Sequence, residues 1–337
     1  MMANASGTLE RVPIKWLEPR DAERAASNDA PAKPAAPPLH APAIVSPVRP
    51  PARRAGLVER LRDLGRRRTL AAGGEAAGAR TAALDPLAIR QRLYGRGYII
   101  PGDAAFVLGL VAPFGLGSAS ALLDLAAGLG GPARTIAQAS HAKVTGLERD
   151  YDRAKLGNAM SAALGTGHLV KIQNCDPESL ELDAARFDAA LGREATYAIA
   201  EKERFLRVVG QSLRTRGQIV LTEFVLDRDA GARDALGAWQ ERQPRRPTLW
   251  TAAQYADCFR SFGYGIRHAE DISALYRRQI VGAWVGYMRA GEIKGLPEAQ
   301  TEAVLAEAEA SLRTVAALES GALKYYRFEA IAHYSFW

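Results

Sequence analysis

The sequence has only two cysteines among its 337 residues, Cys175 and Cys258, and neither has metal-ligand neighbours. This scarcity excludes a disulfide-rich secreted domain and a cysteine-based zinc site, so we expect two free thiols, no bound metal and a cytoplasmic location. No apolar run reaches the roughly 18 residues that a membrane-spanning helix needs. The first residues also lack the basic and then apolar pattern of a signal peptide.

An excess of positive over negative charge is nearly absent from most of the chain, although the net charge is +7. Residues 1–80 contain 14 Lys and Arg against 8 Asp and Glu, a balance of +6 that leaves +1 for the remainder. A folded body with so little excess charge gives no reason to expect a nucleic-acid partner. For the basic leader we expect a solvated tail, and a weak contact with an anionic membrane surface stays open.

A proline-rich stretch separates this leader from the rest of the chain. Residues 31–52 contain eight prolines, which remove backbone donors and favour extended chain over helix. We therefore expect residues 1–82 to form a disordered Pro/Ala/Arg-rich leader. Residues 83–337 would form one domain, with a helical cap over 83–120, a cofactor-binding half over 121–225 and substrate-side elements over 226–337.

Apolar strand patterns alternate with helical patterns from residue 86 onward. This alternation is typical of a mostly parallel sheet with helices on both faces. The strands are expected at 121–125, 143–147, 169–173, 187–191, 218–225, 265–271 and 325–334. The helices are expected at 86–97, 102–112, 132–140, 151–164, 202–213, 251–262, 274–290 and 298–318.

A glycine-rich loop follows the first expected strand, in the run LLDLAAGLGGPA over residues 122–133. Gly128 and Gly130 let the backbone approach a ligand closely, and the following helix start offers unpaired N–H groups. Such sheets bind ligands at the carboxyl ends of their strands. The loop therefore predicts a cofactor site.

Two cofactors fit this loop. The spacing from Gly128 to Glu148 also matches a dinucleotide fingerprint, so an NAD(P)-dependent oxidoreductase is one alternative. Asp124 at the strand tip would instead attract the ammonium group of a methionine moiety and would repel a pyrophosphate. Asp176, after the third strand, is placed to receive an adenine amine. These two acids favour S-adenosylmethionine (SAM).

Five stretches resemble motifs of class I SAM-dependent methyltransferases, in particular the small-molecule branch with phosphoethanolamine, tocopherol and sarcosine methyltransferases. The resemblance covers roughly residues 90–290 and implies a Rossmann-like, seven-stranded sheet, mostly parallel with an antiparallel last strand. The stretches are LLDLAAGLGGPARTIA, KVTGLERD, QNCDPESLELDAARFDAAL, FLRVVGQSLRTRGQIVLTEFVL and PTLWTAAQYADCFRSFGYGIRHAEDIS.

The resemblance also implies which residues hold SAM. Those at its methionine end, its ribose and its adenine would be Asp124, Ala126, Gly128, Gly130, Glu148, Arg149, Cys175, Asp176 and Pro177. Two positions depart from the family pattern, since Ala126 replaces the usual first glycine and Ala198 replaces a common histidine. These departures motivate a second alternative, a non-catalytic scaffold or regulatory protein with the same fold.

The acceptor side is less well defined by the sequence. Glu194 and Tyr197 follow the fourth strand and are our candidates for catalytic contact with the acceptor. Trp250 and Tyr255 are the candidates for substrate binding, because aromatic faces attract cationic amines. The expected reaction is methyl transfer to a small-molecule or lipid-like acceptor, with the accepting atom and the oligomeric state left open.

Overall fold

The computed structural model describes residues 85–230, 233–293 and 295–332. The leader expected over residues 1–82 lies outside the described residues. The first described helix begins at Pro86, where Asp85 caps it by accepting a 3.0 Å hydrogen bond from the Leu87 amide. Within the described part of the chain, no helix is both long and apolar enough to cross a membrane.

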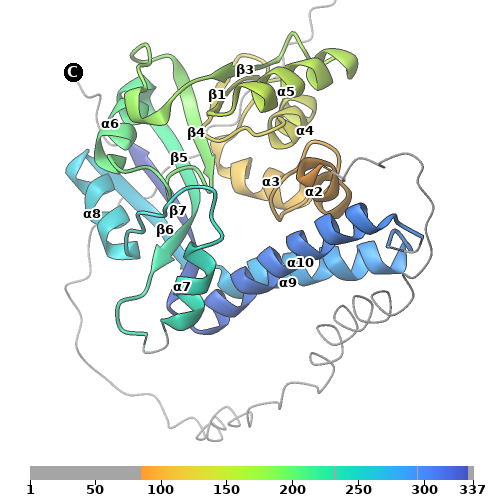
Figure 1. Cartoon of the computed structure of the whole chain (residues 1–337). Coiled ribbons are helices and arrows are strands. Elements are labelled where there is room, and N and C mark those ends of the chain that lie inside the picture. The colour runs from red at the N-terminus through yellow and green to blue at the C-terminus, as the bar shows by residue number, and fades with distance from the viewer. Residues whose placement is uncertain (1–84, 231–232, 294, 333–337) are drawn as a thin grey trace, which may run out of the picture. The chain divides into compact units, whose positions relative to one another are not determined.

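Strands and helices alternate along the chain, as Figure 1 shows. The strands are β1 (Ala121–Asp124), β2 (Lys143–Glu148), β3 (Val170–Asn174), β4 (Phe187–Arg193), β5 (Leu213–Leu226), β6 (Tyr264–Asp271) and β7 (Leu323–Ala332). The α-helices are α2 (Pro86–Tyr94), α3 (Ala104–Val111), α4 (Gly131–Ser140), α5 (Tyr151–Ala163), α6 (Lys202–Ser212), α7 (Asp234–Gln240), α8 (Ala252–Ser261), α9 (Ser273–Arg289) and α10 (Glu298–Glu319). Short 3₁₀ turns cover Ala112–Phe114 and Pro177–Ser179.

The seven strands form one sheet in the order β3-β2-β1-β4-β5-β7-β6. The first five strands are parallel, and β7 runs antiparallel to both of its neighbours. The order reverses beside β1, so the carboxyl ends of β1 and β4 flank a switch point, where open sheets of this type bind ligands. The expected Rossmann-like sheet with an antiparallel last strand is confirmed.

Neighbouring residues of the central strands point to opposite faces of the sheet, and each face has its own core. Leu122 on β1 packs with residues of α3, α4 and α5. Leu123, the next residue, packs with residues of α6 and α8 on the other face. Burial on both faces explains why the central strands are apolar runs instead of alternating patterns.

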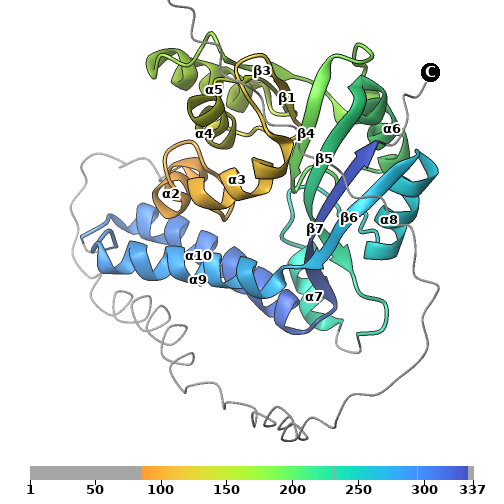
Figure 2. The same ribbon diagram turned by 180° about the vertical axis from the view of Figure 1, so that it is seen from behind.

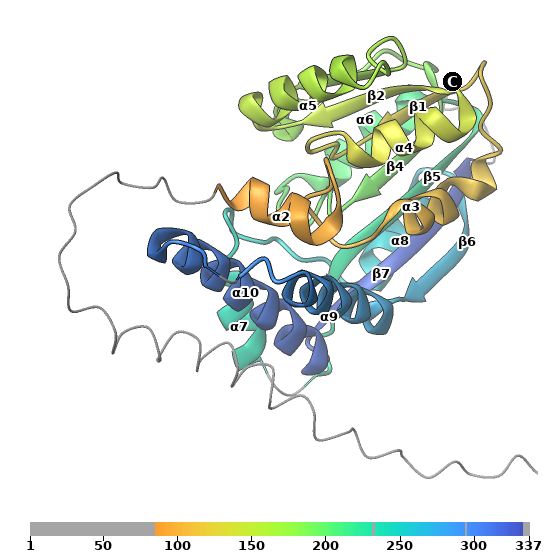
Figure 3. The same cartoon turned by 90° about the vertical axis from the view of Figure 1, so that its right-hand side faces the viewer.

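Three helices outside the sheet layers form a group that we call the cap helices: α2, α9 and α10. Figures 1 and 2 show α9 and α10 side by side, and α2 lies against both of them. Figure 3 shows the same arrangement from the side, with α7 against α10. The first and the last described helices are thereby brought to the same place, beyond the carboxyl ends of the strands.

Two elements differ clearly from the sequence expectation, whereas the ends of the other described elements lie within about three residues of the expected ones. Strand β5 begins at Leu213 instead of residue 218, because Leu213 already pairs with Phe187 of β4. A bulge with Arg216 in the left-handed region (φ 62°) then interrupts the pairing before it resumes at Gln218. Helix α7 was not expected. It has only seven residues and no side-chain cap, and Gly237 lies inside it, so the sequence carries no start signal there.

Candidate active site

Asp124 ends β1 at the switch point and is 2% exposed. Its Oδ1 accepts a 3.2 Å hydrogen bond from the Ala126 amide, whereas its Oδ2 has no hydrogen-bond partner among the described residues. Burial is the main reason why the pKa of this carboxyl rises to about 6. A buried carboxylate oxygen without a partner is costly, so its presence at a cavity wall indicates a place for a cationic ligand.

The glycine loop after β1 takes left-handed backbone conformations at Gly128 (φ 55°) and Gly130 (φ 75°). A Cβ at Gly128 would lie 2.8 Å from Cδ1 of Ile99, so the loop passes directly beneath the segment between α2 and α3. The Gly131 amide donates a 3.0 Å hydrogen bond to the Gly97 carbonyl oxygen and fixes the two segments together. The bare backbone predicted from the sequence is therefore in close contact with its surroundings.

Glu148 ends β2, two residues beyond the Gly146 that pairs with Asp124, and is 7% exposed. Its Oε1 accepts a 2.8 Å hydrogen bond from the Asp150 amide and lies 3.7 Å from an Arg153 nitrogen. Glu148, Asp124, Ala126 and Gly128 all line one cavity. The structure thus brings four of the predicted cofactor residues together.

The residues predicted for the adenine end do not line this cavity. The Asp176 side chain is 60% exposed, accepts a 3.2 Å hydrogen bond from the Glu178 amide and lies 3.7 Å from an Arg149 nitrogen. Cys175 is half-buried, and its amide donates a 3.0 Å hydrogen bond to the Glu148 carbonyl oxygen. These residues and Pro177 follow β3, one strand beyond Glu148, so an extended ligand would have to leave the cavity past Glu148 to reach them.

The cavity has a volume of about 260 Å³. Its wall is built from the tips of β1, β2, β4 and β5, the segment after α2, helix α7 and the cap helices. Its lining residues include Arg90, Tyr94, Asp124, Gly128, Glu148, Arg193, Glu194, Tyr197, Phe224, Trp239, Gln243, Tyr276, Glu307, Ser311 and Thr314.

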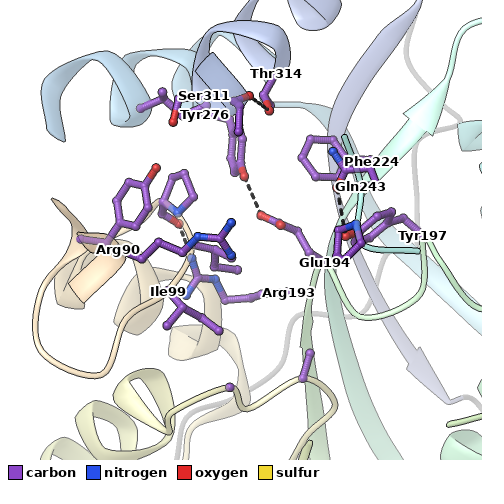
Figure 4. A pocket seen from close by; sticks show the side chains of 18 of the residues that line it. Arg90, Ile99, Arg193, Glu194, Tyr197, Phe224, Gln243, Tyr276, Ser311 and Thr314 are labelled. Carbon is purple, nitrogen blue, oxygen red and sulfur yellow. Dashed lines mark hydrogen bonds between the residues drawn. The ribbon is translucent and has the colours of Figure 1, made fainter. Parts of the chain in front are cut away.

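Glu194 follows β4 directly and has a left-handed backbone (φ 56°), which is a strained conformation for a residue with a side chain. Its Oε1 accepts a 2.6 Å hydrogen bond from the Tyr276 hydroxyl and a 3.5 Å one from the Tyr325 hydroxyl. Figure 4 shows its carboxylate pointing across the cavity toward Tyr276. Burial raises the pKa of Glu194, so this group is poised to exchange a proton.

Arg193, the last residue of β4, is 3% exposed although it is an arginine. One terminal nitrogen donates to the Pro101 carbonyl oxygen, but its Nε and Nη1 have no hydrogen-bond partner among the described residues. Its charge is close enough to Asp124 to oppose the rise in the pKa of that carboxyl. The guanidinium lies over the Phe106 ring, 5.6 Å from the centroid. Two unsatisfied N–H groups at a cavity wall suit an anionic group.

Aromatic rings form the wall behind Glu194. Phe224 on β5 is central, with ring centroids at 5.6 Å from Tyr197, 5.0 Å from Trp239 and 5.5 Å from Tyr276. Tyr197 is also fixed by a 3.3 Å hydrogen bond from its hydroxyl to Oε1 of Gln243, visible in Figure 4. A carboxylate in front of aromatic faces is an arrangement that stabilises a cation.

The cap helices supply the polar roof of the cavity. Arg90 on α2 and Glu307 on α10 form a 2.9 Å ion pair. Ser311 and Thr314 lie on the same helix one and two turns further on, and both appear above the cavity in Figure 4. Arg90 is more than 200 positions away from the three α10 residues in the sequence, and it meets them through the packing of α2 against α10.

The structure does not bring the two predicted substrate residues into this cavity. Tyr255 is fully buried in the core between α8 and the sheet, where its hydroxyl lies 2.6 Å from Oγ1 of Thr196. Trp250 packs against Tyr255, with the ring centroids 5.2 Å apart. The predicted catalytic residues Glu194 and Tyr197 do line the cavity, and Ala198 does not.

Sequence reasoning missed several lining residues. Arg193 ends β4, and a charged residue at the tip of an apolar strand was a usable signal for it, whereas Phe224 looks like any other apolar residue of β5. Arg90, Tyr94 and Ser311 gave no signal, because each lies on a helix whose partner is distant in the chain. Outside the cavity lining, Arg134 in the glycine-loop helix was also missed. It is 4% exposed and donates a 2.8 Å hydrogen bond to the Leu129 carbonyl oxygen.

Comparisons with known proteins agree with this geometry. Residues 103–269 match the family model described as "Methyltransferase domain". A sarcosine/dimethylglycine N-methyltransferase from Halorhodospira halochloris is 29% identical over 108 residues, which are 32% of this chain and 39% of that protein. The match therefore spans well under half of the relative's length.

Two solved structures illustrate the likeness in fold. A phosphoethanolamine N-methyltransferase 2 from Haemonchus contortus superposes with a TM-score of 0.66 at 15% identity, covering 73% of this chain and 56% of that one. The [4+2]-cyclase SpnF superposes at 0.52 and 19% identity, covering 85% and 97%. Because the fold also occurs in a protein named for another reaction, function has to be argued from the site. Residues 103–269 thus match a methyltransferase domain, and the strand order and the cavity at the switch point are those of the Rossmann-like methyltransferase fold.

Proposed function

We propose that this protein transfers a methyl group from SAM to a small-molecule amine. The observation that carries the proposal is a pair of buried carboxyl groups that line one cavity at the ends of two adjacent strands. Asp124 on β1 has an oxygen without a partner, and Glu194 follows β4 before an aromatic wall. Each carboxyl group can bind one cationic ligand, Asp124 the cofactor and Glu194 the acceptor. Because both line one cavity, the two ligands would lie together, as methyl transfer requires.

The cofactor half suits SAM in three respects. The free Oδ2 of Asp124 is a partner for the ammonium group, and the free Nε and Nη1 of Arg193 suit the carboxylate at the same methionine end. The bare backbone at Gly128 permits close approach. Glu148 has a second carboxylate oxygen for ribose hydroxyls, since only its Oε1 is engaged by Asp150. When bound, SAM supplies the activated methyl group.

The acceptor half suits an amine. The carboxylate of Glu194 and the faces of Tyr197, Phe224 and Tyr276 favour positive charge at the accepting centre. An ammonium acceptor must lose a proton before its nitrogen can form the new N–C bond, while the S–C bond of SAM breaks. Glu194 is the group placed to take that proton, because burial has raised its pKa.

The names of two of the relatives agree with this assignment. The Halorhodospira protein is a sarcosine/dimethylglycine N-methyltransferase, and the Haemonchus structure is a phosphoethanolamine N-methyltransferase. Both names denote transfer to nitrogen. They support the amine class, and the roof formed by Arg90, Glu307 and Ser311 supports a small polar acceptor over an extended apolar one.

The two alternatives make different demands on the same cavity. A dinucleotide would place its pyrophosphate beside Asp124, where the buried carboxylate would repel it. A scaffold without ligand would have no use for unpaired polar groups on Asp124 and Arg193, which destabilise the unliganded protein.

The test is a methyl-transfer assay with isotopically labelled SAM and a panel of primary, secondary and tertiary amines, alongside alcohols and alkenes. We expect label in at least one amine, and heat of binding for SAM and for its demethylated product. Transfer to an alcohol or alkene alone would overturn the amine assignment. Binding of NAD without any affinity for SAM would overturn the proposal as a whole.

A further inference from the structure

The segment that carries Glu194 and Tyr197 has no regular secondary structure of its own. We call residues 194–200, between β4 and α6, the acceptor loop. It begins with the left-handed backbone of Glu194 and is tied to β5 by a 2.8 Å hydrogen bond from the Glu194 amide to the Thr222 carbonyl oxygen. A strained loop keeps one conformation only where its surroundings over-determine it. Two buried titratable side chains that the proposed chemistry does not use lie directly against this loop.

The first is Glu223 on β5, which is completely buried. Its side chain lies on the sheet face away from the cavity, because Thr222 and Phe224 on either side of it face Tyr325 and the aromatic wall. Its Oε1 accepts a 2.7 Å hydrogen bond from the Thr196 amide, in the middle of the acceptor loop. Its Oε2 has no hydrogen-bond partner among the described residues.

The second is Lys202, the first residue of α6, which is 1% exposed. Its Nζ donates a 2.5 Å hydrogen bond to the Ile199 carbonyl oxygen near the end of the acceptor loop. It also donates to Oγ1 of Thr248 at 2.5 Å and to the Thr248 carbonyl oxygen. The Thr248 amide in turn donates a 2.8 Å hydrogen bond to the Tyr197 carbonyl oxygen, so this lysine joins the acceptor loop to the segment that precedes α8.

The two groups carry an electrostatic cost that packing alone would not require. Burial raises the pKa of Glu223 to about 8, and Lys202, Glu194 and Thr196 are the other groups that act on it. Burial likewise lowers the pKa of Lys202 to about 8, opposed by Glu223 and Glu178. Apolar residues of similar size are often at least as stable in such places, so buried ionisable pairs call for another reason to be there.

We propose that Glu223 and Lys202 are positioning residues, which together hold the acceptor loop in the one conformation that turns Glu194 into the cavity. They touch neither ligand site. Glu223 fixes the middle of the loop through the Thr196 amide, and Lys202 fixes its end through Ile199. This inference rests on the proposed function for its kinetic consequences, but the fixing of the loop does not depend on the reaction.

The experiment compares Glu223→Gln with Glu223→Leu. The amide oxygen of glutamine still accepts the Thr196 hydrogen bond, whereas leucine cannot. We expect Glu223→Leu to raise the KM for the amine at least tenfold while the Kd for SAM stays within twofold of the wild type. For Glu223→Gln, we expect the KM for the amine and the Kd for SAM both to stay within threefold of the wild-type values. Lys202→Met is expected to follow Glu223→Leu, and it carries the test if Glu223→Leu does not fold.

Hydrogen exchange of peptides that contain residues 194–200 gives a second readout that needs no activity. Exchange should become faster by at least tenfold in Glu223→Leu and Lys202→Met, and it should be unchanged in Glu223→Gln. Ser212→Ala is the matched control, because Ser212 is completely buried at the far end of α6 and its hydroxyl donates to the Val209 carbonyl oxygen of the same helix, away from the acceptor loop. Equal exchange in all variants, or equal losses in SAM affinity and amine KM, would overturn the inference. If neither the wild type nor any variant transferred a methyl group, the proposed function would be overturned. The hydrogen-exchange result alone would then decide whether Glu223 and Lys202 position the acceptor loop.

Discussion

The two halves of the cavity are built in opposite ways. On the cofactor side, Asp124, Gly128 and Glu148 lie within 25 positions of one another and come from consecutive strand tips. On the acceptor side, Arg90, Glu194 and Ser311 come from three elements that are far apart in the chain. The cofactor half is therefore a local property of a strand–loop–helix unit, whereas the acceptor half exists only when the cap helices have packed.

The halves also differ in how their charges are satisfied. In the cofactor half, Oδ2 of Asp124 has no hydrogen-bond partner among the described residues, so a cationic ligand can bind there without displacing a protein contact. Glu194 already accepts a hydrogen bond from Tyr276, and a ligand must compete with or add to that contact. Removing either carboxylate should therefore affect one ligand and spare the other, and the following predictions test that separation.

The largest expected effect is on the cofactor side. Asp124→Asn should raise the Kd for SAM at least 100-fold, a loss of about 2.7 kcal/mol, because a neutral amide replaces the buried charge that faces the ammonium group. Isothermal titration calorimetry measures it. Asp150→Asn is the control, since Asp150 caps α5 beside the same site but is largely exposed and outside the cavity. An equal loss in both variants would contradict a specific role for Asp124.

The same variant should be more stable than the wild type without ligand. Because the pKa of Asp124 is about 6 in the folded protein and 3.8 is its ordinary value, the wild type loses stability as the pH rises from about 4 to about 6. Asp124→Asn avoids this loss and should gain about 1–3 kcal/mol in unfolding free energy at pH 7, measured by urea denaturation. The difference in unfolding free energy between the variant and the wild type should therefore increase from pH 4 to pH 7. A difference that decreases over this range would contradict this account.

The next effect is on the acceptor side. Glu194→Gln should lower kcat/KM for the amine about 100-fold, because it removes both the negative charge and the proton acceptor. The Kd for SAM should stay within twofold. Tyr276→Phe removes the 2.6 Å hydrogen bond to Glu194 but keeps its carboxylate, so kcat/KM should fall only about tenfold. A Glu194 variant that loses SAM affinity as well would show that the two halves are not separate.

The smallest effect is expected at the residues that the sequence placed in the substrate site. Trp250→Phe should change the KM for the amine less than threefold, because Trp250 packs on Tyr255 outside the cavity. The ring of phenylalanine retains most of that packing. Steady-state kinetics at saturating SAM measure it, and a tenfold rise in KM would restore Trp250 to the acceptor site.

The contrast explains how far the sequence could predict this protein. The strand–helix order and the glycine loop were predictable, because buried parallel strands and left-handed glycines leave local patterns. The acceptor half was not, since nothing within α2 or α10 says that Arg90 and Glu307 will pair. Glu223 was hidden for a different reason: within the strand run VLTEFVL it looks like a surface charge, although it is completely buried.

The most direct test of the account is a SAM titration of the wild type and of Asp124→Asn, followed by calorimetry at pH 5 and pH 8. Protonation of Asp124 near pH 6 should weaken SAM binding at pH 5 by about tenfold in the wild type, since the pKa of this carboxyl is about 6. The asparagine variant should bind weakly at both pH values without that dependence. Tight, pH-independent binding by both proteins would contradict a cofactor site built around this carboxylate.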